Sequence, residues 1–165
     1  KMGGRIKIIN KKKYFGEPVG DLFVQSSNLK GIKVPLKWIT TSIDDLVVIW
    51  VACGLANGES YFKGISELRL KESDRIKTMS EVLNKLGIRT RSTKDSLKIY
   101  GKTNINRKKN IYIKSTLDHR IAMASFVAGQ VTGNNILIKG FETVSSSFPN
   151  FLKFQKKIGA KYEIK

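Results

Sequence analysis

The fold is decided by the stretch Leu68-Arg69-Leu70-Lys71-Glu72-Ser73-Asp74-Arg75, which runs on through an apolar pattern to Leu86 and Gly87. The apolar residues of that pattern fall on one helical face and predict a helix over 74–86 that ends at Gly87; they are Ile76, Met79, Val82, Leu83 and Leu86. We expect Ser73 to be the N-cap, with Asp74 in the first turn.

Four charged residues crowd the start of this helix: Lys71, Glu72, Asp74 and Arg75. Free backbone N–H groups at a helix start already favour an anion, so two additional cations there make most sense if an anionic ligand binds. A charged turn with local ion pairs explains the same residues equally well. Spacing alone leaves both interpretations open.

Composition limits the possible functions of the chain. Its 165 residues are enough for one domain with a hydrophobic core, and 31 Lys and Arg against 13 Asp and Glu give a net charge of +18. The basic residues are mostly lysines spread along the chain, whereas base recognition in nucleic acids relies on arginine. The charge therefore favours small anionic ligands or simple solubility, and we expect no nucleic-acid partner.

Cysteine and apolar patterning restrict the cellular setting. Cys53 is the only cysteine, so no internal disulfide can form, and we expect neither a metal site nor a cofactor. A single buried thiol fits the reducing cytoplasm. No signal peptide is visible, and the apolar run from Leu46 to Ala56 is too short to span a bilayer, so we expect no membrane partner.

A short pattern occurs three times, 84 and 72 residues apart: Lys1-Met2-Gly3-Gly4-Arg5, Lys85-Leu86-Gly87-Ile88-Arg89 and Lys157-Ile158-Gly159-Ala160-Lys161. Each copy is typical of a helix end, a glycine cap and the start of a strand. We therefore expect an internal structural repeat. Because the first copy would begin inside a helix, we expect the natural chain to continue upstream of Lys1.

The remaining patterns predict an α/β fold. Strands are expected over 5–9, 21–25, 60–63, 96–100, 111–114, 136–139 and 161–164, and helices over 43–56, 74–86, 120–131 and 150–158. Three consecutive lysines at 11–13 are expected at the solvated tip of a hairpin. Three serines at 145–147 precede the last helix and are expected to cap it.

Two further helix starts carry charged residues. Asp44 and Asp45 follow the expected caps Thr41 and Ser42, and either can compensate the helix dipole or act as a base. His119 is the only histidine and stands beside Arg120 at the third start. A lone histidine is more often structural than catalytic. If the three starts converge, the cations gather into a cleft suited to a phosphate or carboxylate substrate.

These motifs resemble the C-terminal part of the 5-enolpyruvylshikimate-3-phosphate synthase family. The resemblance rests on the stretch 68–75, on Asp118-His119-Arg120-Ile121-Ala122-Met123-Ala124 and on Ser147-Phe148-Pro149, with support from Ile43-Asp44-Asp45 and Gly16-Glu17-Pro18-Val19-Gly20-Asp21. It implies an inside-out α/β barrel of βαβαββ repeats, as in enolpyruvyl transferases. Residues 1–165 would be most of the second of two domains, with the N-terminal domain absent and the active site between them.

The resemblance also implies a reaction and roles. Family members transfer the enolpyruvyl (carboxyvinyl) group of phosphoenolpyruvate to the 5-hydroxyl of shikimate 3-phosphate, in aromatic amino-acid biosynthesis. Asp44 matches the acid that takes the hydroxyl proton, and Glu72 the acid that moves a proton at the methylene carbon. Lys71 matches a lysine that contacts the shikimate phosphate and the reacting centre.

Three other residues match the family's phosphoenolpyruvate side. Arg75 and Arg120 match the arginines that bind this substrate, and His119 matches a histidine near the site. The implied partners are the two substrates and the N-terminal domain, in a cytoplasmic enzyme that is monomeric at full length. We expect the chain alone to have little or no activity, because a cleft between two domains cannot close with one wall.

The chain departs from the family at three places. Ser145, Ser146 and Ser147 stand where some members have a lysine that contacts phosphoenolpyruvate. Glu67 replaces an asparagine that contacts the shikimate phosphate in some members, and Asp45-Leu46-Val47 replaces a more usual Glu-x-Pro. Two alternatives remain at this point. One is a UDP-sugar enolpyruvyl transferase of the same fold, and the other is a non-catalytic basic module that binds polyanions.

Overall fold

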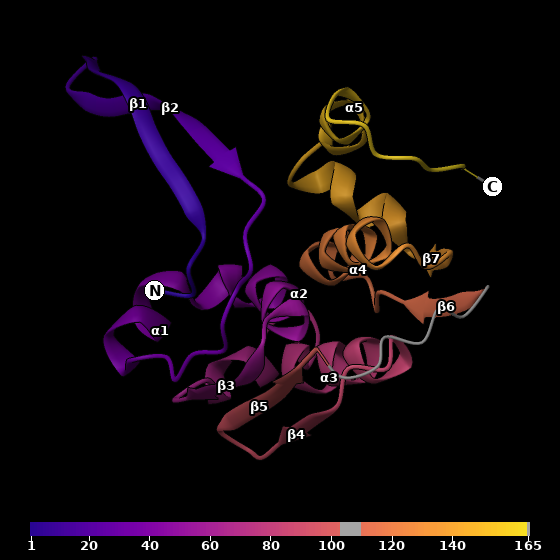
Figure 1. The fold of residues 1–165 in the computed structure, drawn as a ribbon. Coiled ribbons are helices and arrows are strands. Elements are labelled where there is room, and N and C mark those ends of the chain that lie inside the picture. Colours follow the sequence, from indigo (N-terminus) through magenta and orange to yellow (C-terminus); the bar gives the residue numbers. More distant parts are fainter. Residues whose placement is uncertain (103–109, 165) are drawn as a thin grey trace.

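Three helices pack against one another between two sheets: α2 (Leu46–Leu55), α3 (Arg75–Lys85) and α4 (His119–Thr132) (Figure 1). The computed structural model describes residues 1–102 and 110–164. Two shorter helices, α1 (Leu36–Ser42) and α5 (Phe151–Lys157), lie before α2 and near the end of the chain. The predicted α/β fold is confirmed.

Within the described residues, the strands form three small sheets. The first is a hairpin of β1 (Arg5–Tyr14) and β2 (Glu17–Gln25), and the second has the order β3-β5-β4, formed by β3 (Gly58–Lys63), β4 (Thr90–Ser92) and β5 (Ser96–Gly101). Neighbouring strands in both are antiparallel. In the third, β6 (Ile111–Lys114) and β7 (Ile136–Lys139) are parallel, so α4 is their crossover helix.

A complete βαβαββ unit lies in the middle of the chain. Residues 30–33 run parallel to β3 through bridges from Lys30 to Asn57 and from Lys33 to Tyr61. The order from this segment is therefore strand, helical run α1–α2, β3, α3, β4 and β5. Gly31 permits the approach, because a Cβ at this position would lie 2.1 Å from the carbonyl oxygen of Glu59.

The three glycines of the repeated pattern share one conformation. Gly3, Gly87 and Gly159 have φ values of 89°, 84° and 92°. After α3, Ile88 N–H donates to Leu83 and Gly87 N–H to Asn84, and the end of α5 repeats this Schellman arrangement. The strand expected over 161–164 is wrong: the N–H and carbonyl of Lys161 bond instead to the side chain of Gln130.

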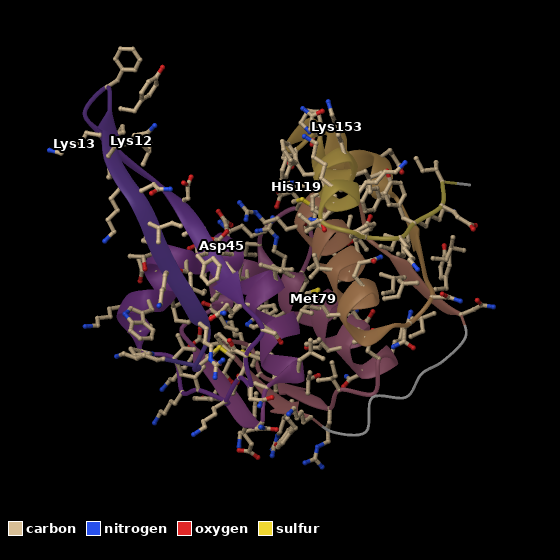
Figure 2. All side chains as sticks on the ribbon, turned by 45° about the horizontal axis from the view of Figure 1, so that its top comes forward. Lys12, Lys13, Asp45, Met79, His119 and Lys153 are labelled. Atoms are coloured by element: carbon tan, nitrogen blue, oxygen red, sulfur yellow. The ribbon has the colours of Figure 1, made fainter. Side chains whose placement is uncertain are left out.

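The β1–β2 hairpin extends away from the helices and is exposed along its whole length (Figure 1). The expected tip at 11–13 is wrong, because β1 continues to Tyr14 and the turn falls at Phe15 and Gly16. The register shifts at a bulge between Ile9 and Lys12, and both turn residues have positive φ, 49° at Phe15 and 86° at Gly16. Lys12 and Lys13 are solvated as expected, near the outer end of the hairpin (Figure 2).

The helical run at α2 is longer than its sequence pattern indicates. Leu36–Leu55 is helical over 20 residues, with a 3-10 turn at Ile43–Asp45, and passes the length and composition test for a membrane span. Buried core helices pass the same test, and Trp50, Val51 and Cys53 are buried where α2 packs on α3 and α4. We therefore assign α2 to the core of the fold.

We predict that the thiol of Cys53 is protected while the chain is folded. Burial raises the pKa of this thiol to about 11, and the thiolate is the reactive form. Modification by Ellman's reagent at pH 8 should therefore be at least about 100-fold slower in buffer than in denaturing urea. Equal rates in the two solvents would contradict the packing of α2 described here.

Candidate functional site

Arg75 lies at the centre of a cluster of charged side chains where α2, α3 and α4 meet. Its side chain is only 1% exposed, and each of its three nitrogen atoms donates to a carboxylate. Nε donates to Asp118 at 2.9 Å, Nη1 donates to Asp44 at 2.9 Å, and Nη2 donates to Glu72. Burial alone would lower the pKa of Arg75, but the bond to Asp118 and the neighbouring carboxylates raise it above its usual value.

Asp118 connects the two motifs of the site. Its side chain is fully buried and accepts hydrogen bonds from Arg75 and from the hydroxyl of Ser73 at 2.9 Å. It also caps α4 by accepting from the backbone N–H groups of Arg120 and Ile121. Burial would raise the pKa of Asp118, but these donors and the charge of Arg75 lower it.

Asp44 brings the three predicted cations together. Its carboxylate lies 2.9 Å from Arg75, 3.8 Å from Lys71 and 3.9 Å from Arg120. Its backbone carbonyl accepts a further hydrogen bond from Arg120 at 2.8 Å. Asp44 lies in the 3-10 turn between α1 and α2 and not at a free helix start, and no side-chain cap from Ser42 is formed. The expected convergence of the cations is therefore found. It is produced by the starts of α3 and α4 and by the 3-10 turn that joins α1 to α2, and not by three helix starts.

Lys71 and Glu72 lie next to Arg75 on the approach to α3. Lys71 forms an ion pair with Glu67, four residues earlier, and its side chain is 25% exposed. The hydrogen bond to Glu67 is the main reason why the pKa of Lys71 is raised. The carboxylate of Glu67 is therefore paired with Lys71, and that of Glu72 is paired with Arg75.

His119 and Arg120 form the first turn of α4. Arg120 is 32% exposed and lies 3.3 Å from the carboxylate of Asp45. His119 is half-buried. Figure 2 shows His119 and Asp45 at neighbouring helix ends, on the side of the molecule from which the hairpin extends. His119 and Arg120 therefore lie on the same side of the molecule as the carboxylate of Asp45.

Two expected helix caps are wrong. Asp74 caps α3 by accepting from the N–H of Lys77, and Arg69 holds the Asp74 carboxylate at 2.6 Å. Ser73, the expected cap, bonds to Asp118 instead. The expected cap of α5 by the serines is also wrong: the hydroxyls of Ser145 and Ser146 donate to carbonyls inside their own 3-10 turn.

The loop directly before Asp118 has unusual backbone φ angles. Thr116 and Leu117 are consecutive non-glycine residues with φ values of 55° and 60°. Such positive φ values cost on the order of 1 kcal/mol or more per residue and persist where the surroundings demand them. The strain lies directly before Asp118, whose bonds to Arg75 and to the start of α4 fix the loop.

Sequence reasoning missed the two residues that join the motifs. The sequence gives Asp118 no role beyond its place in the Asp118-His119-Arg120 motif, and it favours Ser73 as a helix cap and not as a partner of Asp118. The signal for Asp118 was its place directly before an apolar helical run, which favours an N-cap. Nothing in the sequence indicates that the same carboxylate also binds Arg75, which lies 43 residues away along the chain.

The arrangement places cations that can hold an anion beside exposed carboxylates. Lys71, Arg75 and Arg120 supply fixed cations, and Asp44 and Glu72 supply half-exposed carboxylates within contact of them. Within the described residues, no three His, Cys, Asp or Glu side chains are grouped as a metal ion would require. The cluster combines groups of the kind that bind anions with groups of the kind that transfer protons.

Known proteins match almost the whole chain. A family model described as EPSP synthase (3-phosphoshikimate 1-carboxyvinyltransferase) matches residues 1–154. Curated proteins named 3-phosphoshikimate 1-carboxyvinyltransferase are 40% identical over 166 residues in Zymomonas mobilis and 42% identical over 157 residues in Petrotoga mobilis. These matches cover 99% and 95% of this chain, but only 37% and 36% of the relatives.

The structural comparison gives the same result. EPSP synthase from Acinetobacter baumannii matches with a TM-score of 0.84 and 33% identity, over 98% of this chain and 38% of that one. The chain thus spans little more than a third of the length of the proteins that it matches.

We predict that Asp118→Asn lowers the free energy of unfolding by about 3 kcal/mol at pH 7, because one partner of a buried pair is removed. The lowered pKa of Asp118 means that its ionised form contributes stability above the unfolded pKa of about 3.8, and that this stability is lost as the pH falls through the folded pKa. The difference between wild type and variant, measured by urea unfolding, should therefore shrink below about pH 4. A difference that stays constant down to pH 2 would contradict this.

Proposed function

The chain belongs to the EPSP synthase family, and from this we propose that residues 1–165 form most of the C-terminal domain of an EPSP synthase. The full enzyme transfers the enolpyruvyl group from phosphoenolpyruvate to the 5-hydroxyl of shikimate 3-phosphate and releases phosphate. The missing length, more than half of each relative, supplies the N-terminal domain and the second wall of the cleft. The enzyme acts in the cytoplasm, as a monomer at full length.

One observation carries this proposal: Asp44 lies within 4 Å of Lys71, Arg75 and Arg120, three cations from two separate stretches of the chain. Two anionic substrates must be held side by side for the reaction, and this requires cations at more than one point. A carboxylate among those cations is then in place to accept the proton of the attacking hydroxyl.

The cations divide between the two substrates. Arg120, partly exposed at the start of α4, and Arg75, deeper in the cluster, bind phosphoenolpyruvate. Guanidinium groups suit this task, because they donate two parallel hydrogen bonds to a carboxylate or phosphate. Lys71 contacts the phosphate of shikimate 3-phosphate and the reacting centre.

The acids carry the proton transfers. Asp44 takes the proton from the 5-hydroxyl as the tetrahedral intermediate forms. Glu72 delivers and removes the proton at the methylene carbon, and both carboxylates have the exposure that contact with a substrate requires. His119 lies in the first turn of α4, next to Arg120 in the chain, and belongs to the same proposed site. No cofactor takes part.

A non-catalytic polyanion-binding module is the alternative from another class. It predicts a salt-dependent affinity for DNA that survives loss of both Arg75 and Arg120. The proposed enzyme predicts instead that anion binding is lost with Arg75 and Arg120, because phosphoenolpyruvate binds at these two residues. A UDP-sugar enolpyruvyl transferase is not favoured, because the matching family model and both curated relatives are of the shikimate type.

We predict that Arg120→Ala in the full-length protein lowers kcat/KM for phosphoenolpyruvate by about 10- to 100-fold, through the loss of charge-assisted hydrogen bonds. The assay is phosphate release in the presence of shikimate 3-phosphate. Arg91→Ala removes an exposed arginine on β4 and should leave the rate unchanged. Residues 1–165 alone should release no phosphate above background. A rate from this chain close to that of the full-length protein would refute the two-walled cleft.

A further inference from the structure

The charge balance inside the cluster does not suit an open anion site. Three cations contact five carboxylates: Asp44, Asp45, Glu67, Glu72 and Asp118. Every cation is paired, Lys71 with Glu67, Arg120 with Asp45, and Arg75 with three partners. A dianionic ligand entering this arrangement unchanged would meet an excess of negative charge.

The three partners of Arg75 are not equivalent. Asp118 is fully buried, whereas the side chains of Asp44 and Glu72 are 45% and 49% exposed. A buried carboxylate that leaves its partner strands a charge in the interior at a high cost, whereas a half-exposed one is rehydrated when it leaves. Asp118 is therefore a fixed partner, while Asp44 and Glu72 are exchangeable.

The geometry of the guanidinium separates the two kinds of partner. The Nε side of the guanidinium faces Asp118, which accepts from Nε at 2.9 Å and from Nη2 at a longer 3.4 Å. Nη1 donates to Asp44, and Nη2 donates at shorter range to Glu72. The outer nitrogens are the donors that an incoming carboxylate or phosphate would use for a two-point contact. In this structure the chain's own carboxylates occupy those positions.

We propose that Asp44 and Glu72 are internal substitutes for the substrate anion on Arg75, and that binding of the anion displaces them. Asp118 holds the Nε edge throughout, so the guanidinium stays in place while its outer partners exchange. The displaced carboxylates then have free lone pairs with which to accept a proton. Anion binding thereby prepares the bases, an inference that rests on the proposed function for the identity of the anion.

Nitrogen NMR of arginine side chains tests the exchange directly. The full-length protein is labelled with ¹⁵N-arginine, Arg75 signals are assigned with an Arg75→Lys variant, and inorganic phosphate and then phosphoenolpyruvate are added. The Nη signals of Arg75 should shift on saturation while its Nε signal stays in place. Nη signals that do not move when Arg120 signals show saturation would overturn the proposal.

Glu72→Gln gives a second measurement. Removing this charge should tighten phosphate binding by about tenfold, the equivalent of one charge-assisted hydrogen bond that no longer has to be broken. Glu81→Gln removes the same charge from an exposed position on α3, and serves as the matched control. Equal affinities of the two variants for phosphate would refute the exchange. Backbone amide spectra of both variants establish that α3 is intact.

The two proposals fail in different ways. If the Nη signals move and Glu72→Gln binds phosphate more tightly, the exchange stands even if the full-length protein transfers no enolpyruvyl group to shikimate 3-phosphate. If the transfer is observed but the Nη signals stay fixed, the proposed function stands and the exchange is wrong.

Discussion

The buried pair of Asp118 and Arg75 is the constraint on which the rest of the site depends. Ions of this kind lose several kcal/mol of hydration when they are buried, and only complete hydrogen bonding repays the loss. Asp118 accepts five hydrogen bonds, two from Arg75 and one each from Ser73, Arg120 and Ile121. These donors come from the entry to α3 and the start of α4. Satisfying one buried carboxylate therefore fixes the two motifs against each other.

From this pair the other charged groups take their places in order of increasing exposure. Arg75 is held on its inner edge and offers its outer nitrogens to Asp44 and Glu72. Asp44 in turn lies between Arg75, Lys71 and Arg120. The cluster thus passes from a rigid interior to half-exposed carboxylates at the surface. Such a gradient suits a site that must be preorganised and yet exchange partners with a charged substrate.

Much of this could be predicted from the sequence, because local patterns encode it. The apolar face from Ile76 to Leu86 predicted α3, and Gly87 predicted its end, because few other residues adopt a φ of 84° without strain. The resemblance to the family also implied that Arg75 and Arg120 belong to one site, and both lie within 4 Å of Asp44. The caps were wrong where two polar residues stood side by side, as with Ser73 and Asp74, since tertiary contacts decide which of them caps. The final strand was wrong because Gln130 satisfies the backbone of Lys161.

A double-mutant cycle between Arg75 and Asp118 tests the central claim most directly. The free energy of unfolding is measured for wild type, Arg75→Met, Asp118→Asn and the double variant. If the buried pair organises the site, the two changes are strongly coupled, and the double variant is more stable than additivity predicts by at least about 2 kcal/mol. Additivity within about 0.5 kcal/mol would show that the two residues act independently, and would contradict the account.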